Sequence, residues 1–426
     1  MLRISALKYS DSGKKLDYVY DYDDKISKFF NSKESFYCHY DIDVSKVPES
    51  IAIIPFLANI LPIAWFAGFS IELNEIDEEF MLALDHIKTE FIKKHPSIDF
   101  YRTKIHAKRI LKNNYPAKRS SMLFSGGVDA YATYFRHHQS PLDLITIHGA
   151  DVEIEDTIQW ERVLELNETE ELLDTNRKHY IKSNLKTFYK PHVELLLPYP
   201  GWWGKVQHGL ALNAIVAPLS VINGYRINYI ASSYTEDIDI AWGSTPELDN
   251  NIKWGNTKII HDGYELKREE KIGWIVNTAK NLSKPINIRV CYSLLNRSVN
   301  CSKCEKCYRT IIALILNNVN PNKYGFDIDI KIYNQVLTKL NNGFSSKGEE
   351  YFWWEILEKI ELNTAFYIFS DKAREVEKMI ELRELIEENI ITGLKVLPRF
   401  YNIKFRIQTL LPSLFKIYLK FRQRKL

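Results

Sequence analysis

The chain has 426 residues, of which 45% are hydrophobic and 26% charged, and its formal net charge is +3. This composition is ordinary for a soluble globular protein, and the length predicts two or three domains. The small net charge argues neither for nor against a nucleic-acid partner. The N-terminus leads into charged, tyrosine-rich sequence without a secretory signal, so we expect a cytoplasmic protein.

Residues 1–115 predict an N-terminal α/β domain in which we find no catalytic motif. Residues 2–9 and 18–21 have the pattern of strands, and residues 80–93 have the apolar spacing of an amphipathic helix. The polar, proline-ended stretch at 112–116 is the best boundary with the sequence that follows.

An uncharged stretch at residues 51–71 is long enough to suggest a membrane span. Pro55 and Pro62 interrupt it, and Gly68 lies near its end. A proline at the start and a glycine at the end are typical of helix boundaries. We therefore expect a buried helix followed by a strand at 69–73, and no membrane span.

The most informative motif is Ser125-Gly126-Gly127-Val128-Asp129. It lies between an apolar run, residues 121–124, and a predicted helix, residues 130–138. Glycines let backbone N–H groups approach an anion, and a helix N-terminus adds positive potential, so the motif suits phosphate. Ser125 can offer a hydroxyl, and Asp129 can lie near a metal ion or cap the helix. No lysine closes the loop as in the longer Gly-x-x-x-x-Gly-Lys motif, and an ordinary Gly-Gly turn is the alternative.

Four of the five cysteines lie close together in the sequence: Cys291, Cys301, Cys304 and Cys307. Thiols in a large cytosolic chain stay reduced, and four thiolates around one ion form a closed tetrahedral zinc site. Such a site has a structural role, because no ligand position stays open for substrate. Lys303 and Lys306 lie between the cysteines and would offset the negative charge. An iron–sulfur cluster uses similar spacings and is the alternative.

The two motifs in this order resemble the 7-cyano-7-deazaguanine synthase (QueC-like) branch of the PP-loop ATP pyrophosphatase superfamily. The resemblance covers roughly residues 116–320, and the gap of nine residues after Cys291 is slightly longer than in the family. The segment from Arg268 to Glu270 is similar to the family's Lys-x-Glu helix start. One departure is Ala130, where the family has a second serine.

The resemblance implies an α/β fold with the parallel sheet of adenine nucleotide alpha-hydrolase-like (PP-loop, HUP-type) proteins and a four-cysteine zinc lobe. It implies a PP-loop domain at 116–325, followed by a helical extension at 326–426. The implied activity is that of a ligase that uses ATP, Mg²⁺ and structural Zn²⁺. Such an enzyme adenylates a carboxylate resembling 7-carboxy-7-deazaguanine, releases pyrophosphate and then AMP, and forms an amide or nitrile.

The resemblance also suggests roles for individual residues. The nucleotide would be bound by the loop residues Ser125, Gly126, Gly127, Val128 and Asp129. The catalytic residues would be Asp129, which lies near the phosphates and Mg²⁺, and the cations Arg268 and Lys271, which stabilise the charge of the reacting phosphates. Lys205 is a further candidate cation. A deazapurine ring would be contacted by Glu236, Asp239, Trp242 and Asp249, because carboxylates accept N–H groups and tryptophan stacks. The metal ligands would be Cys291, Cys301, Cys304 and Cys307.

The C-terminal region predicts helices at 351–362 and 371–390. Residues 396–426 contain eight Lys or Arg and no acid. Residues 409–425 mix these with apolar residues, as in a basic amphipathic helix for an acidic partner, RNA or a membrane surface. A packing helix with a solvated basic end is the alternative.

Larger QueC-like proteins of this kind occur in anti-phage defence systems, so the resemblance implies either ammonia or an amine of a partner protein as the acceptor of the activated acid. One rival is a PP-loop enzyme that modifies tRNA by thiolation or lysidine-type chemistry. Thiolation needs a reactive cysteine near the loop, and only Cys38 is left over. Another rival is a nucleotide-binding scaffold whose loop has decayed at Ala130.

Overall fold

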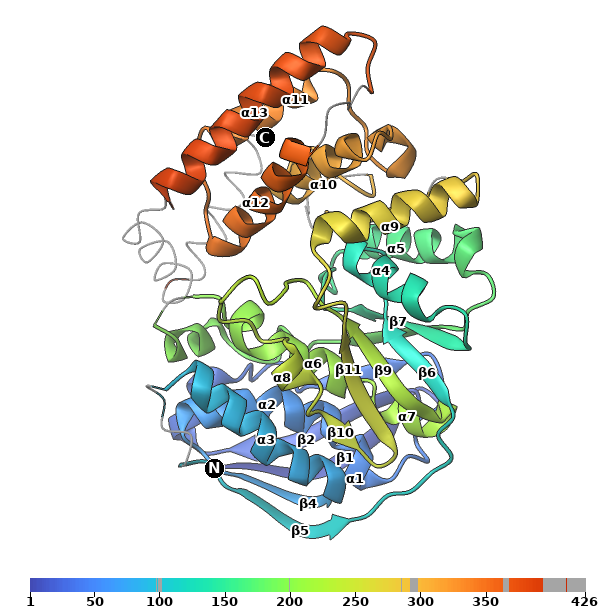
Figure 1. Cartoon of the computed structure of the whole chain (residues 1–426). Coiled ribbons are helices and arrows are strands. Elements are labelled where there is room, and N and C mark those ends of the chain that lie inside the picture. Colours follow the sequence, from blue (N-terminus) through green and yellow to red (C-terminus); the bar gives the residue numbers. More distant parts are fainter. Residues whose placement is uncertain are drawn as a thin grey trace.

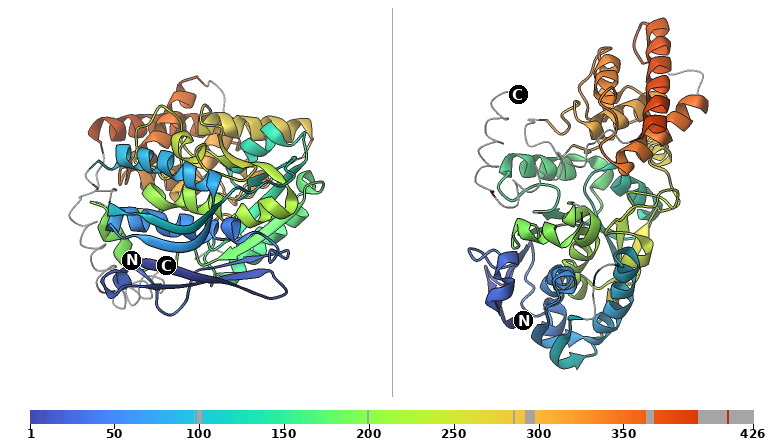
Figure 2. Two further views of the ribbon diagram at one scale, coloured as in Figure 1. Left: turned by 90° about the horizontal axis from the view of Figure 1, so that it is seen from below. Right: turned by 90° about the vertical axis from the view of Figure 1, so that its left-hand side faces the viewer.

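The computed structural model describes residues 1–96, 98, 102–198, 200–284, 286–291, 298–362, 368–393 and 411. Within these residues, eleven strands form one largely parallel sheet in the order β10-β11-β9-β6-β7-β8-β3-β2-β1-β4-β5. The C-terminal helices lie at one end of the molecule and the first strands at the other (Figures 1 and 2). The protein is therefore α/β with a largely parallel central sheet, as the sequence predicted.

Five parallel strands form the half of the sheet that carries the Ser-Gly-Gly motif: β6 (Arg119–Leu123), β7 (Leu142–His148), β8 (Lys178–Ser183), β9 (Tyr225–Ala231) and β11 (Thr257–Asp262). Their order across the sheet is β8-β7-β6-β9-β11. The chain thus proceeds from β6 to one side and returns to the other side with β9. Open α/β sheets bind ligands at such a reversal, outside the carboxyl ends of the strands.

The first part of the chain extends the same sheet with β1 (Leu2–Ser10), β2 (Lys15–Tyr22), β3 (Tyr37–Tyr40), β4 (Ile71–Asp77) and β5 (Ile105–Leu111). Strand β3 pairs antiparallel with β8, with Cys38 opposite Ser183, and joins the two halves. The strands before and after Pro116 therefore share one sheet, and the domain boundary there stays a prediction.

Helix α2 (Ile54–Ala67) lies inside the fold. Its residues up to Phe66 are buried, and it packs against α6 (His208–Ala214). An apolar surface all around a helix is typical of a helix enclosed by protein. Gly68 ends the helix with a φ of 73°, and β4 begins three residues later. The prediction of a buried helix followed by a strand is confirmed.

One helical stretch among the described residues, Trp203–Asn223, is long and apolar enough to cross a membrane, with a mean hydropathy of 1.2 over its most apolar window. It contains the π-helical turn η5 (Trp203–Gln207), α6 and α7 (Ala217–Asn223). Within the structure, 72% of that window is buried, as in the core helix of a globular fold. The stretch is therefore no evidence for a membrane span.

Helix α3 (Glu78–Lys94) brings the two edges of the sheet near each other. It connects β4 to β5 and also contacts the short edge strand β10 (Lys253–Trp254), where Lys253 pairs with Glu79 at 2.7 Å. The first 250 residues also contain these shorter or peripheral helical elements: α1 (Glu49–Ala52), α5 (Thr157–Thr169), α8 (Pro246–Asp249), η1 (Asp24–Phe29), η3 (Glu171–Leu173) and η4 (Pro191–Leu196).

A second core contains the helices around the Ser-Gly-Gly motif and the C-terminal helices: α4 (Val128–His137), α9 (Arg268–Asn281), α10 (Glu305–Leu316), α11 (Ile332–Leu340), α12 (Lys347–Leu362) and α13 (Lys372–Thr392), with η6 (Pro321–Tyr324). Helices α12 and α13 were predicted, but α11 was not. The predicted basic helix at 409–425 lies outside the described residues except for Leu411.

Candidate functional site

The Ser-Gly-Gly-Val-Asp segment forms the turn from β6 into α4. Phe124 donates its N–H to the Ile145 carbonyl at 2.8 Å and accepts from the Thr146 hydroxyl at 2.8 Å. Gly126 then adopts a φ of 73°, which favours glycine. Gly127 precedes the first turn of α4, and no side chain caps that helix. The helix N-terminus can therefore accept an anion.

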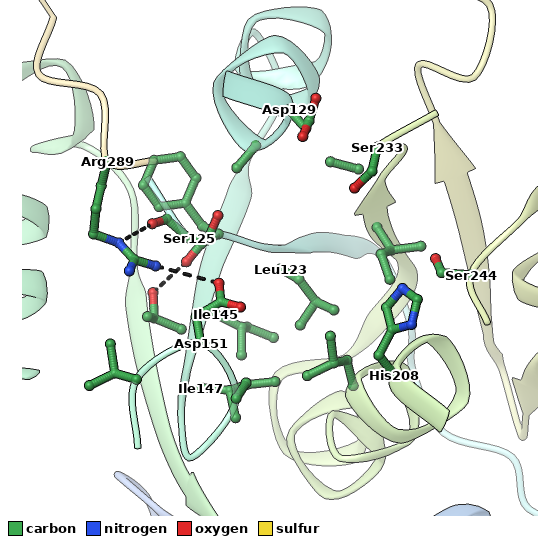
Figure 3. Close-up of a pocket in the computed structure, with 18 of the residues that line it drawn as sticks. Leu123, Ser125, Asp129, Ile145, Ile147, Asp151, His208, Ser233, Ser244 and Arg289 are labelled. Atoms are coloured by element: carbon green, nitrogen blue, oxygen red, sulfur yellow. Dashed lines mark hydrogen bonds and ion pairs between the residues drawn. The ribbon is translucent and has the colours of Figure 1, made fainter. Parts of the chain in front are cut away.

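Arg289 holds this turn from the side of the cysteine cluster. Its backbone N–H donates to the Gly126 carbonyl at 2.7 Å, and its Nε donates to the Ser125 carbonyl at 2.9 Å. Its guanidinium also lies 3.5 Å from Asp151, which follows β7 (Figure 3). Arg289 lies two residues before Cys291 in the chain. This short segment therefore links the cysteine cluster to the turn.

Asp129 contacts both cations that the sequence singled out. Its carboxylate lies 2.9 Å from Arg268 Nη1 and 3.4 Å from Lys271 Nζ. Lys271 also donates to the Ser232 carbonyl at 2.6 Å, and this bond holds its ammonium group next to the residue that follows β9. Burial raises the pKa of Asp129, but the two cations outweigh burial and leave that pKa below its usual value. The structure thus brings the three predicted catalytic residues together, with the carboxylate ionised.

A cavity of about 400 Å³, the inner cavity, opens where the strand order reverses. The ends of β6, β7 and β9 contribute its apolar wall, which includes Leu123, Ile145 and Ile147 (Figure 3). Trp203 and Trp242 line it from other segments, with His208. Its volume is that of a small-molecule site, and flat aromatic and aliphatic groups suit a planar ring.

A second cavity of about 370 Å³, the outer cavity, adjoins the first. The two cavities have six lining residues in common: Ser125, Asp129, Ser233, Trp242, Arg289 and Lys306. Among the residues that the structure describes, five cationic side chains line the outer cavity: Arg268, Arg289, Lys306, Arg309 and Lys339. Three acidic side chains of the described residues line it as well: Asp129, Glu305 and Glu349. This formal excess of two positive charges suits an anionic ligand.

Two of these cations are held at an electrostatic cost. Burial lowers the pKa of Lys306 to about 8, and the nearby Arg309 adds to this effect. Burial also lowers the pKa of Arg309 below its usual value. A bound anion would offset the repulsion between these groups.

The residues predicted to contact a deazapurine ring lie in different places. Trp242 lines both cavities and lies edge-on to Tyr234, with ring centroids 5.1 Å apart. Glu236 and Asp239 are exposed and line neither cavity. Asp249 is buried, lines neither cavity and accepts from Ser244 and His261 at 2.5 and 2.8 Å. Of the four, only Trp242 is positioned to contact a ligand in either cavity.

The four predicted metal ligands converge, because the sulfur atoms of Cys291, Cys301, Cys304 and Cys307 all lie within 4.8 Å of one another. The sulfur atoms are 3.7 Å apart for Cys301–Cys307, 3.5 Å for Cys304–Cys307 and 3.9 Å for Cys304–Cys291. A tetrahedral zinc site with Zn–S bonds of about 2.3 Å requires sulfur separations of about 3.8 Å. The cluster could therefore hold one metal ion such as zinc, while the multi-iron alternative would need more space between the sulfurs.

Comparisons with family models, with curated proteins and with solved structures found no match to this chain. The interpretation of the site therefore depends on its geometry and on the motifs themselves.

Sequence reasoning missed several lining residues: Arg289, Arg309, Lys339, Trp203 and His208. Lys306 was expected to balance the charge of the cysteine cluster, but it lines both cavities. A signal for part of this set was present, because Lys306 and Arg309 lie three residues apart on α10 and so share one face. The predicted cation Lys205 lines neither cavity.

Proposed function

We propose that this protein is an ATP-dependent, AMP-forming ligase that adenylates a carboxylate and joins it to a nitrogen nucleophile. One observation carries this proposal. The Ser-Gly-Gly-Val-Asp turn lies at the reversal point of a parallel sheet, where it separates an apolar cavity from a cationic one. Such a site suits a nucleotide, whose rings are planar and whose phosphates are anionic.

In the proposed reaction, a carboxylate oxygen of the substrate attacks the α-phosphorus of ATP. The bond from that phosphorus to the bridging oxygen breaks, and pyrophosphate leaves with the electron pair. A nitrogen nucleophile then attacks the acyl carbon, AMP leaves with the electron pair of the C–O bond, and the nitrogen loses a proton to solvent. Arg268 lines the outer cavity and stabilises the charge of the phosphates, and Asp129 is the loop carboxylate able to hold Mg²⁺. Lys271 lines neither cavity, and its role is to hold Asp129 in place.

The acid in this proposal is a deazapurine carboxylate resembling 7-carboxy-7-deazaguanine. Two neighbouring cavities, each as large as a small-molecule site, give room for a nucleotide and a second ring. Trp242 lines both cavities and is the side chain best placed to stack on that ring. The acceptor is ammonia or an amine of a partner protein, in the setting of anti-phage defence.

Metal bound by the four cysteines has a structural role in this proposal. Arg289 contacts the phosphate-binding turn through Ser125 and Gly126, and Cys291 follows two residues later. A closed four-thiolate site leaves no position open for substrate. Its contribution would be to fix Arg289, and through it the turn.

The structure weakens one rival. Thiolation of tRNA requires an accessible nucleophilic cysteine, but Cys38 is fully buried in β3, and burial raises its pKa to about 12. This thiol lines neither cavity.

The decisive experiment incubates the protein with ATP, Mg²⁺ and the deazaguanine acid, with and without ammonium or candidate partner proteins. Mass spectrometry of all products should show AMP and pyrophosphate in amounts that depend on the acid. The Asp129→Asn variant should lose this activity, and Asp329→Asn, on an exposed carboxylate, should retain it. Absence of AMP with every carboxylate would favour the scaffold alternative, and turnover that requires tRNA would favour a tRNA-modifying enzyme.

A further inference from the structure

One wall of the outer cavity comes from outside the segment that resembles PP-loop enzymes. Lys339 lies on α11, and the remaining residues of this wall belong to the turn before α12 and to the first residues of α12: Ser345, Ser346, Gly348, Glu349 and Phe352. We call these residues, with Lys339, the α11–α12 wall. It faces the Ser-Gly-Gly-Val-Asp turn across the cavity, because Ser125, Gly127 and Asp129 line the same space.

Close packing holds the α11–α12 wall in place. A Cβ at Gly348 would clash with the hydroxyl of Tyr234 and lie 3.1 Å from its Cζ, so only glycine permits this approach. Tyr234 stacks on Phe352 with ring centroids 5.1 Å apart and planes at 18°. The Thr235 and Tyr351 hydroxyls are 2.5 Å apart. The wall is thus docked on the loop that follows β9 and has a defined position relative to the turn.

The charges on this side of the cavity are incompletely satisfied. Arg309 is 7% exposed, its guanidinium lies 4.0 Å from the Phe352 ring centroid, and its Nε has no hydrogen-bond partner among the described residues. Its Nη1 is 3.3 Å from Glu305. Lys339 lies 3.0 Å from Glu349, whose carboxylate also accepts from the Ser345 N–H. A buried donor without an acceptor is costly, so the cavity is suited to a ligand rich in acceptor oxygens.

We infer that the α11–α12 wall is an anion subsite that binds the terminal diphosphate of the nucleotide, opposite the Ser-Gly-Gly-Val-Asp turn. This inference rests on the proposed function for the identity of the ligand. A diphosphate fits better than a single carboxylate, because the described lining residues have a formal excess of two positive charges and the volume of the space is about 370 Å³. The C-terminal helices would then determine how strongly ATP and pyrophosphate bind, while AMP would not depend on them.

Two pairs of variants test the subsite: one pair removes a cation, and the other adds a negative charge. Lys339→Ala removes a cation from the wall, and Lys331→Ala, on an exposed lysine just before α11, is its control. Ser346 accepts from the Glu349 N–H at the start of α12. Ser346→Asp keeps this cap but adds a negative charge, whereas Ser346→Asn keeps the cap without the charge. The second pair therefore changes the charge of the wall without removing the cap of α12.

Titration calorimetry on the full chain would use pyrophosphate, AMP and α,β-methylene-ATP. Lys339→Ala should bind pyrophosphate and the analogue about tenfold more weakly than the wild type, and AMP equally well, because it loses one charged hydrogen bond to the ligand. Lys339→Arg and Lys331→Ala should bind all three like the wild type. Ser346→Asp should bind pyrophosphate about tenfold more weakly than Ser346→Asn.

The outcomes separate this subsite from the proposed function. Equal pyrophosphate affinity in Ser346→Asp and Ser346→Asn, or an equal loss of AMP and pyrophosphate binding in Lys339→Ala, would overturn the subsite while AMP formation could continue. Pyrophosphate binding that depends on Lys339, in a protein that forms no AMP from any acid, would support the subsite and overturn the ligase. A wild-type protein that binds none of the three ligands would overturn both.

Discussion

Replacing Cys304 with serine should remove the metal and loosen the nucleotide site. Cys304 lies between two of the other ligands, with its sulfur 3.9 Å from that of Cys291 and 3.5 Å from that of Cys307. A serine hydroxyl stays protonated at neutral pH and is a poor substitute for a thiolate. The ion would keep only three ligands, and the segment that contains Arg289 would lose its anchor to α10.

The size of the effect follows from the geometry. Structural zinc in small peptides contributes about 10–16 kcal/mol, so the loss of one ligand in four costs roughly 2.5–4 kcal/mol. The unfolding entropy of a chain of 426 residues is about 0.9 kcal/mol/K at about 2.1 cal/mol/K per residue. A cooperative unfolding transition should therefore shift down by about 3–4 °C. Nucleotide affinity should also fall, because Arg289 holds the Ser125 and Gly126 carbonyls.

Metal analysis by mass spectrometry and a thermal melt would measure both effects. The wild type should contain about one zinc per chain, and Cys304→Ser should contain less and melt lower. Cys38→Ala is the matched control, because it alters a buried cysteine far from the cluster in sequence and should keep the metal. A wild type free of metal, or a variant with unchanged zinc content and melting temperature, would refute the metal site.

Three further predictions concern the turn and its supports. Arg268→Ala should slow AMP formation about 100-fold or more, because it removes the cation 2.9 Å from Asp129; an unchanged initial rate would contradict its role. Gly126→Ala should cost roughly 1–2 kcal/mol of unfolding free energy and weaken nucleotide binding, because its φ is 73° and a Cβ would lie 3.1 Å from a neighbouring leucine. Gly393 has a φ of 72° and no neighbour within 4 Å in the described part of the chain, so Gly393→Ala should show the backbone cost with no change in nucleotide affinity. Burial raises the pKa of Glu355 to about 7, so the folded state retains this proton more tightly than the unfolded state, and stability falls as pH rises from about 4.3 to 7. Glu355→Gln should consequently gain stability over the wild type at pH 8 but not at pH 4, and equal gains in denaturant melts at both pH values would count against this assignment.

The elements whose signals are local were predictable from the sequence. The turn from β6 into α4 was recognisable because two glycines between an apolar run and a helical segment favour a tight backbone turn. The cysteine cluster was recognisable because the triplet at 301–307 brings three sulfurs together within one turn. Helix α2 was recognisable from a charge-free run closed by Gly68. In each case the information lies within a short segment.

Features that depend on distant parts of the chain were not predictable. Strand β3 has four residues, and nothing in Tyr37–Tyr40 specifies β8 as its partner. The position of a basic residue in the sequence does not reveal which cavity its side chain faces, so Arg289 and Lys339 were missed. Loop carboxylates present the same problem, since Asp249 is enclosed by its hydrogen-bond partners while Asp239 is exposed. Helix α11 was missed because its buried positions span only Ile332–Leu340.

The antiparallel pairing of β3 with β8 constrains how this protein can be shortened. A fragment that began near Pro116 would leave the hydrogen-bonding edge of β8 without its neighbour and would strip α2 from α6. Exposed strand edges and bare apolar helix faces promote aggregation. The first 115 residues thus cover the edge of β8 and one face of α6, so any assay on a shortened protein should be accompanied by a measurement of its solubility.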